Sequence, residues 1–150
     1  MTTVDAVGTA NRAAVMAVYE AFGRGDVATI VETLSADVSW DADWADSFAQ
    51  RTAVGHYLPR RGPAEVMDFF RVVASYTVHS FEVQDVLVGA DRVACVIVID
   101  ATMPNGGRYR DEEMHLWTFD AEGRICALRH YIDTAKHLAA ARGEDTTVAE

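Results

Sequence analysis

The stretch that decides the fold is the C-terminal segment Tyr109-Arg-Asp-Glu-Glu-Met-His115-Leu-Trp-Thr-Phe-Asp-Ala-Glu-Gly-Arg-Ile-Cys-Ala-Leu-Arg-His130-Tyr-Ile-Asp133. Two runs of bulky apolar residues flank Asp120-Ala-Glu-Gly123, and this pattern predicts two antiparallel strands joined by a tight turn. Residues at equal distance from the turn then lie opposite each other, so His115 and His130 are expected to be cross-strand neighbours facing one cavity. Two adjacent imidazoles resist double protonation, so at least one should stay neutral near pH 7.

The composition limits the classes of function. The chain has 150 residues, half of them hydrophobic, and a net charge of −10, which indicates one domain with a substantial core. Because nucleic acids and anionic membranes bind positive surfaces, neither is an expected partner. Cys95 and Cys126 lie in apolar runs without CxxC spacing, which favours free buried thiols. With no signal pattern and no apolar run long enough to span a bilayer, the expected location is cytoplasmic.

The spacing of apolar and turn-forming residues predicts the elements. Helices are expected at about 9–22, after the N-cap Asp26, from Gly62-Pro63 and at 134–142, and strands at about 38–41, 78–88, 92–102, 108–119 and 124–132. The ends, 1–8 and 144–150, are expected to be loose. The order predicts one α+β domain with its core at about 9–142, a cone-shaped roll. Three N-terminal helices pack on the concave face of its curved, mostly antiparallel sheet, and its open end is the expected pocket.

Two further features concern the surface. The segment from Asp41 to Arg61 is irregular and rich in aromatic residues, which predicts a mobile flap that closes the cone mouth. The strand around Val93–Ala101 is apolar on both faces, with one set expected to contain Val93, Cys95, Ile97 and Ile99 and the other Ala94, Val96, Val98 and Ala101. Because the helices cover only one face, the second face predicts a homodimer formed through the sheet.

The chain resembles the nuclear transport factor 2-like superfamily at three places. These are Gly25-Asp26 followed by Ser35-Ala-Asp-Val-Ser-Trp40, the stretch from Gly55 to Phe70, and Trp117 to Ile125 followed by Tyr131-Ile-Asp133. The best-matching branch is the SnoaL-like group, which includes polyketide cyclases and relatives of ketosteroid isomerase and limonene-epoxide hydrolase. The resemblance implies an α+β cone with a deep apolar pocket, often dimeric through the sheet. Because its members differ in activity, it implies no single reaction.

The resemblance also bears on the two histidines. His115 falls where ketosteroid isomerases place a carboxylic acid that hydrogen-bonds the substrate oxygen. His130 resembles the position where SnoaL-type cyclases carry an acid/base Asp, so the chain departs from the cyclases there. The general-base Asp of ketosteroid isomerases aligns with Ala42 and their helix-one Tyr with Val18, so the chain is not identified as a ketosteroid isomerase.

These residues suggest acid–base chemistry on a small apolar or polycyclic ligand: isomerisation, cyclisation, dehydration or epoxide opening. His115 would bind the substrate oxygen and His130 would move the proton, oriented by Glu113, with Asp41 or Tyr19 assisting at the cone mouth. The substrate-binding candidates are Tyr19, Trp40, Trp44, Tyr57, Phe69, Phe70 and Trp117. The alternative is a non-catalytic ligand-binding or dimeric interaction module of the same fold.

Other patterns indicate no additional chemistry. There is no Gly-rich phosphate loop, no GxSxG and no Cys/His zinc spacing, so no cofactor is expected. Asp41, Asp43 and Asp46 lack the glycine and closing glutamate of a calcium-binding EF-hand, and no metal is expected. The remaining polar candidates are assigned to the surface: His56, His79, His137, Asp111 and Glu112.

Overall fold

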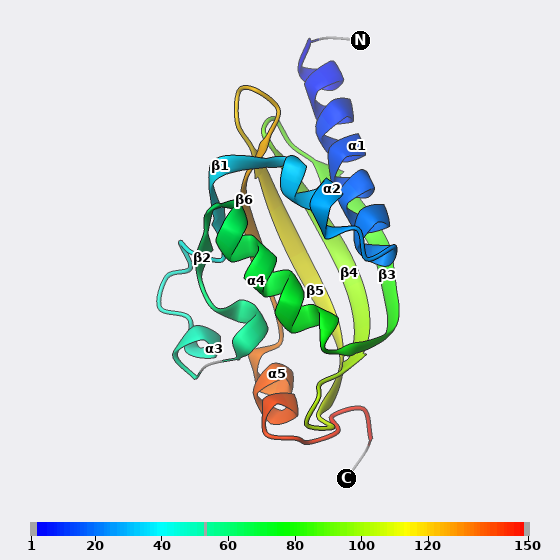
Figure 1. Ribbon diagram of the computed structural model, residues 1–150. Coiled ribbons are helices and arrows are strands. Elements are labelled where there is room, and N and C mark those ends of the chain that lie inside the picture. The colour runs from blue at the N-terminus through cyan, green and yellow to red at the C-terminus, as the bar shows by residue number, and fades with distance from the viewer. Residues whose placement is uncertain (1–2, 53, 149–150) are drawn as a thin grey trace.

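The computed structural model describes residues 3–52 and 54–148, and the chain folds as helices on one side of a single sheet (Figure 1). The helices are α1 (Thr3–Gly23), α2 (Val27–Glu32), α3 (Phe48–Arg51), the 3-10 turn η1 (Gly55–Tyr57), α4 (Gly62–Ala74) and α5 (Thr134–Ala141). Helices α1, α2 and α4 lie across the sheet, whereas α5 lies at the end opposite the N-terminus. No helix in the described part of the chain is long and apolar enough to cross a membrane.

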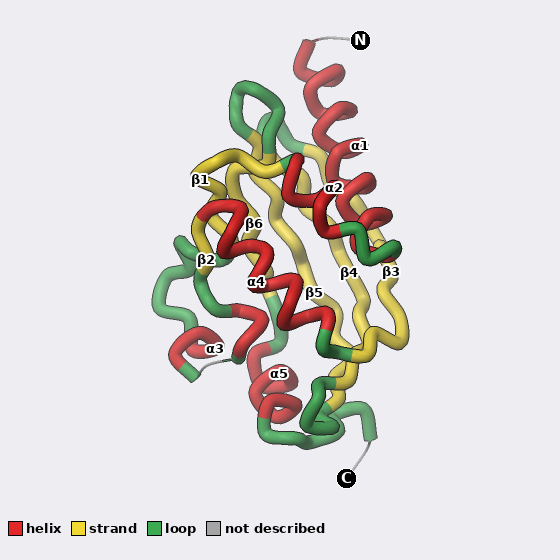
Figure 2. Tube along the Cα trace, in the orientation of Figure 1, coloured by secondary structure: helices red, strands yellow, loops and turns green. Residues whose placement is uncertain are grey.

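The sheet has six strands in the order β2-β1-β6-β5-β4-β3. They are β1 (Leu34–Trp40), β2 (Arg60–Arg61), β3 (Thr77–Val88), β4 (Arg92–Thr102), β5 (Arg108–Phe119) and β6 (Ile125–Tyr131). The predicted meander from β3 to β6 is confirmed, and the early strand β1 joins it parallel to β6. The sheet curves behind the helices without closing, as the trace in Figure 2 shows. The predicted α+β cone is therefore confirmed.

Local chemistry explains the helix ends. The Asp26 carboxylate accepts the Thr29 backbone N–H at 3.2 Å, which caps α2 as predicted. Pro63 occupies the first turn of α4, where the missing N–H costs no intrahelical bond. Asp133 caps α5 in the same way as Asp26 caps α2, through the Lys136 N–H. These caps fix where each helix begins and therefore which face it turns to the sheet.

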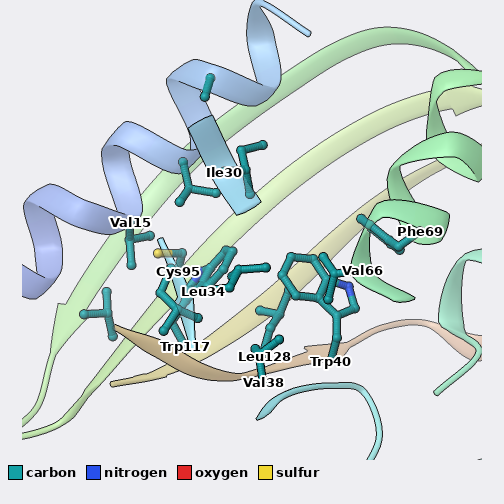
Figure 3. Close-up of a cluster of buried hydrophobic side chains, with 14 of the residues drawn as sticks. Val15, Ile30, Leu34, Val38, Trp40, Val66, Phe69, Cys95, Trp117 and Leu128 are labelled. Atoms are coloured by element: carbon teal, nitrogen blue, oxygen red, sulfur yellow. The ribbon is translucent and has the colours of Figure 1, made fainter. Parts of the chain in front are cut away.

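The main core lies between the sheet and helices α1, α2 and α4. Figure 3 shows Val15 and Ile30 from the helices above Cys95, Trp117 and Leu128 from the strands. Strand β5 carries its inward face at odd-numbered positions: Tyr109, Asp111, Glu113, His115, Trp117 and Phe119 are all buried. The residues in the middle of this row are charged or titratable, and burying them costs free energy unless each group has a hydrogen-bonding or charged partner.

Several sequence-based boundaries were wrong. Helix α1 begins at Thr3 rather than at Thr9, so residues 3–8 are helical. Strand β1 begins at the buried Leu34 rather than at about residue 38. Ala101 lies on the inner face with Ile99, because inward positions of β4 are odd-numbered. The segment from Asp41 to Arg61 contains α3, η1 and β2 instead of one irregular loop.

Candidate functional site

A cavity opens between the helices and the inner face of the sheet. Its volume is about 650 Å³ with the open mouth included. Most of the wall is apolar. The lining residues are Val18, Tyr19, Phe22, Trp40, His56, Tyr57, Phe69, Phe70, Val73, Tyr76, Val78, Phe81, Ile99, Ala101, Tyr109, Glu113, His115, Trp117, Leu128 and His130.

The predicted pairing of His115 with His130 is confirmed. The two residues are direct partners in the β5–β6 register, and both side chains line the cavity. Their ring centroids lie 4.6 Å apart with the planes at 74°. Two imidazoles at this distance disfavour a positive charge on both rings at once, so their protonation states are coupled.

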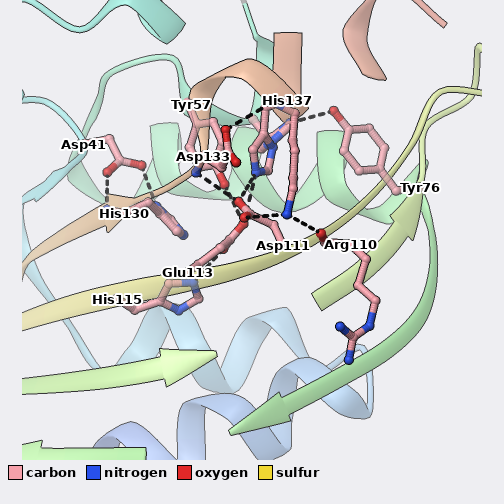
Figure 4. Close-up of polar contacts among 12 residues, drawn as sticks. Asp41, Tyr57, Tyr76, Arg110, Asp111, Glu113, His115, His130, Asp133 and His137 are labelled. Atoms are coloured by element: carbon pink, nitrogen blue, oxygen red, sulfur yellow. Dashed lines mark hydrogen bonds and ion pairs between the residues drawn. The ribbon is translucent and has the colours of Figure 1, made fainter. Parts of the chain in front are cut away.

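Asp41 holds His130 at two points. Its Oδ1 accepts the backbone N–H of His130 at 2.8 Å, and its Oδ2 lies 2.7 Å from ring Nδ1 (Figure 4). A carboxylate only accepts, so Nδ1 carries the proton. No hydrogen-bond partner for Nε2 is found among the described residues. The pair therefore presents the second ring nitrogen of His130 to the cavity.

The Asp41 backbone is unusual, with φ of 52° in the left-handed region. Asp tolerates this conformation better than most residues, and such strain concentrates at functional sites. Its carboxylate is almost fully buried behind His130, so the expected place at the cone mouth was wrong. Burial opposes a charge on His130, but the Asp41 carboxylate outweighs it and raises the pKa of His130 from 6.5.

His115 is enclosed by a second set of hydrogen bonds. Its Nε2 lies 3.0 Å from Glu113 Oε2, and its Nδ1 lies 2.9 Å from the Tyr19 hydroxyl. Because Glu113 only accepts, Nε2 carries the proton, and Nδ1 accepts from Tyr19, which itself accepts the Trp117 indole N–H at 3.0 Å. Burial and the neighbouring His130 lower the pKa of His115. His115 is thus the neutral member of the pair, and both its ring nitrogens are already engaged.

Glu113 joins the two sides of the site. Besides His115, it accepts the Tyr57 hydroxyl at 2.9 Å and lies 3.4 Å from His137 Nε2. Burial opposes its charge, but the hydrogen bonds from His115 and His137 outweigh burial and hold the pKa of Glu113 well below its usual range. Glu113 orients His115, whereas Asp41 takes the orienting role that the sequence analysis gave to Glu113 for His130.

Three residues expected at the surface are buried. His137 Nε2 lies 2.7 Å from Asp111 Oδ2, and His137 Nδ1 lies 3.0 Å from His56 Nε2. Burial lowers the pKa of His56, and the adjacent His137 lowers it further. Asp111 shares strand parity with Glu113 and His115, a signal that places it inside. His137 lies one turn after the cap Asp133, and no local signal reveals His56. His79 is exposed as expected.

Most of the predicted substrate-binding residues line the cavity, and one does not. Tyr19, Trp40, Tyr57, Phe69, Phe70 and Trp117 are in the wall. Trp44 lies outside this wall, where the Arg129 guanidinium stacks 4.8 Å from its ring centroid. Trp44 therefore packs against Arg129 instead of lining the cavity, although it is an aromatic residue in the loop.

The carboxylates give two candidate cation groups. Asp41, Asp43 and Asp46 do not converge, because they bond His130, Arg61 and Arg51 respectively. Ligand atoms of Asp111, Glu113 and His137 do lie within 4.8 Å of one another. Both ring nitrogens of His137 are engaged in hydrogen bonds, so this cluster is satisfied internally and we assign no metal to it.

Comparison with known proteins agrees with this architecture. An NTF2-like protein of unknown function from Burkholderia pseudomallei is 23% identical, with a TM-score of 0.73 over 87% of this chain and 96% of that one. A Mycobacterium tuberculosis protein in complex with estradiol-17β-hemisuccinate is 14% identical, with a TM-score of 0.67 over 83% and 94%. The epoxide hydrolase/cyclase-like enzyme SalBIII, from pyran ring formation in salinomycin, is 20% identical, with a TM-score of 0.65 over 84% and 92%.

At these identities the structural likeness shows the fold. No curated protein matches the sequence significantly. Residues 15–128, which include most of the helices and the β5–β6 hairpin through Leu128, match the SnoaL-like domain. The chain therefore belongs to the SnoaL-like domain family.

Proposed function

We propose that this protein is an enzyme that catalyses proton transfer on a small apolar, cyclic substrate without a cofactor. The observation that carries the proposal is the Asp41–His130 pair, which leaves ring Nε2 of His130 directed at an apolar cavity. The Asp41 carboxylate raises the pKa of His130 from 6.5, and an imidazole with one free ring nitrogen in an apolar cavity can serve as a general acid or base. The reaction types that fit are isomerisation, cyclisation, dehydration and epoxide opening.

The other site residues have supporting roles. Asp41 fixes the tautomer of His130, while Glu113 and Tyr19 fix that of His115. His115 lies against the ring of His130, and burial together with the neighbouring His130 lowers the pKa of His115, which keeps His115 neutral beside it. For His115 to bind a substrate oxygen through Nε2–H, its bond to Glu113 would have to be shared with the substrate.

The shape of the cavity supports a slim, cyclic substrate. Trp40, Phe69 and Trp117 present aromatic walls, and little space remains between them. One structural neighbour was captured with a steroid derivative and another acts in pyran ring formation. The steroid derivative and the pyran ring are both cyclic and contain oxygen, which supports a cyclic, oxygen-containing substrate for this protein.

A non-catalytic ligand-binding module is the second candidate. It is favoured by His115, whose two ring nitrogens are held by Glu113 and Tyr19 and are not free for chemistry. Under this reading the buried polar groups would shape the pocket, and His130 would give one hydrogen bond to a bound molecule.

Deuterium exchange tests the enzymatic proposal. The protein is incubated in D₂O with cyclohexanone, 2-cyclohexenone and 2-tetralone, and loss of the protons next to the carbonyl is followed by ¹H NMR. We expect accelerated exchange that falls by about 10²–10⁴-fold in His130→Gln. His79→Gln, which alters an exposed histidine outside the cavity, is the matched control. Ketone binding without accelerated exchange supports the binding module instead.

We also propose a homodimer through the outer face of the sheet and a cytoplasmic location. The outer face carries Met114 and Tyr131 with exposed fractions of 40% and 44%, beside the partly buried Val96 and Leu116. Contiguous apolar residues on a sheet face favour association. The two free thiols, Cys95 and Cys126, suit a reducing compartment.

A further inference from the structure

We propose that Tyr76 is a second functional residue of the cavity, a proton donor to an oxygen atom of the substrate, resupplied by His137 through His56. This inference rests on the proposed function, and it specifies the substrate further as one with an oxygen acceptor near Tyr76. It concerns a row of buried groups that the Asp41–His130 pair does not use.

The row is continuous from the cavity to Asp111. Tyr76 lines the cavity, and its hydroxyl lies 2.9 Å from His56 Nδ1. His56 Nε2 lies 3.0 Å from His137 Nδ1, and His137 Nε2 lies 2.7 Å from Asp111 Oδ2. Figure 4 shows Tyr76, His137 and Asp111 gathered on one side of the site, away from Asp41 and His130. Every heavy-atom distance in the row is within hydrogen-bond range.

The hydrogen bonds in this row can run in two alternative directions, depending on whether His137 is charged. Asp111 and Glu113 accept only, so His137 Nε2 carries a proton in both. If His137 is charged, its Nδ1–H donates to His56 Nε2, and His56 Nδ1–H donates to the Tyr76 oxygen. The Tyr76 O–H then points away from His56 and is available to the cavity. If His137 is neutral, the two hydrogen bonds of His56 reverse, and the Tyr76 O–H is turned inward to His56.

The charges around His137 select the first direction. Strand β5 places the Asp111 and Glu113 carboxylates beside Nε2, whereas η1 offers only the neutral His56 and the phenol of Tyr57, and Tyr109 contributes a phenol from β5. A cation also lies beside the same carboxylate, because Lys136 Nζ is 3.8 Å from Asp111 Oδ1. Burial opposes a charge on His137, but the two carboxylates outweigh it and raise its pKa.

The remaining groups suit a donor. Burial and the neighbouring His137 hold the pKa of His56 well below its usual range, so His56 relays a proton without holding a charge of its own. Burial raises the pKa of Tyr76 to about 12, so its hydroxyl keeps its proton at neutral pH until an acceptor takes it.

The transfer balances without any further reactant. When His130 removes a proton from a substrate carbon, negative charge develops on the conjugated substrate oxygen, and the Tyr76 O–H donates its proton to that oxygen. His56 Nδ1–H then restores the Tyr76 hydroxyl, and His137 Nδ1–H gives its proton to His56 Nε2, so His56 stays neutral but changes tautomer. His137 ends neutral with Nε2–H still bonded to Asp111, and the reverse sequence recharges it.

Histidine ring NMR tests the direction directly. In protein labelled with ¹⁵N in histidine, two-bond ¹H–¹⁵N spectra at about pH 6 report the tautomer and charge of each imidazole. We expect His56 to be neutral with its proton on Nδ1 and His137 to carry protons on both nitrogens. A His56 ring with its proton on Nε2 overturns the proposal, because the Tyr76 hydroxyl would then donate inward.

A variant adds an independent readout. Asp111→Asn removes the main acceptor for His137, so we expect His137 to become neutral and His56 to move its proton from Nδ1 to Nε2. An unchanged His56 tautomer in a folded variant contradicts the coupling, and the wild-type spectrum remains decisive if the variant does not fold. The spectra need no substrate, so the two proposals can fail separately. The tautomer of His56 can contradict the role of Tyr76 while the His130-dependent exchange of ketone protons is observed. Equally, the tautomer can agree with that role while no exchange is observed.

Discussion

Asp41 forms two hydrogen bonds with His130: one carboxylate oxygen accepts the backbone N–H of His130 at 2.8 Å, and the other lies 2.7 Å from ring Nδ1. The two bonds fix both the position of the strand residue and the rotation of its ring. They join the residue after β1 to the C-terminal end of β6, two segments that meet only in the folded sheet. The availability of His130 Nε2 follows from this one contact.

Replacing Asp41 with Asn should make stability less dependent on pH between a pH below 6.5 and a pH above the raised folded pKa of His130. His130 has a raised folded-state pKa, so its bond with Asp41 contributes stability fully below the ordinary value of 6.5, and that contribution is lost as pH rises through the folded value. Asp41→Asn should therefore lower the free energy of unfolding more at the acidic end. Asn also tolerates the left-handed backbone, so the comparison isolates the charge.

Urea unfolding at the two pH values measures this difference. Asp43→Asn is the matched control, because the hydrogen bonds from Ser39 and Arg61 lower the pKa of the exposed Asp43 carboxyl, and its titration is complete below this pH range. An equal loss of stability for Asp41→Asn at both pH values would show that His130 gains nothing from the charge.

Tyr57→Phe should destabilise the fold by about 1–3 kcal/mol, the usual cost of depriving a buried acceptor of a partner. The Tyr57 hydroxyl donates to Glu113 Oε1 at 2.9 Å, and the substitution keeps the ring while removing that donor. Tyr131→Phe makes the same chemical change at an exposed ring and should alter stability by less than about 0.5 kcal/mol. Thermal or urea unfolding compares the two, and equal effects would contradict the role given to the Glu113 bond.

The sequence was sufficient for the pairing of His115 with His130, because strand parity and the position of a turn fix which residues oppose each other. The same parity applied to Asp111 would have placed it inside, but its charge favoured the surface. The burial of His56 could not be predicted from strand parity. It lies between α3 and β2 in a segment without periodicity, and its burial depends on α5 and β5 meeting over it.

Asp41 was identified as a candidate but with the wrong role. A pattern of carboxylates around a loop does not reveal which one turns inward: Asp41 and Asp46 both have a left-handed backbone, but only the Asp41 carboxylate reaches His130. Trp44 shows the opposite error: an aromatic residue in a loop suggested a ligand contact, yet it packs against Arg129. Both outcomes depend on long-range contacts that single-residue chemistry does not specify.

Amides in residues 42–47 should exchange with solvent faster than those in β4. This part of the predicted flap has no helix or strand, whereas β4 is paired along its length with β3 and β5. Few backbone hydrogen bonds and exposed side chains give a low free energy of local opening. Hydrogen–deuterium exchange followed by mass spectrometry resolves the two segments, and equally slow exchange would rule out a mobile flap.

Met114→Lys should convert a dimer into a monomer. Met114 lies on the outer face of β5, opposite Val96 of β4 and Tyr131 of β6, so it stands at the centre of an apolar stripe. A lysine there would place its charge within the proposed interface, where desolvation without a partner is costly. Met67→Lys is the matched control, because Met67 on α4 has the same exposed fraction of 40% as Met114 and lies away from the sheet's outer face.

Light scattering at micromolar concentration should give a dimer mass for the wild type and Met67→Lys and a monomer mass for Met114→Lys. A monomeric wild type would refute the interface, and a dimeric Met114→Lys would place the contact elsewhere on the molecule.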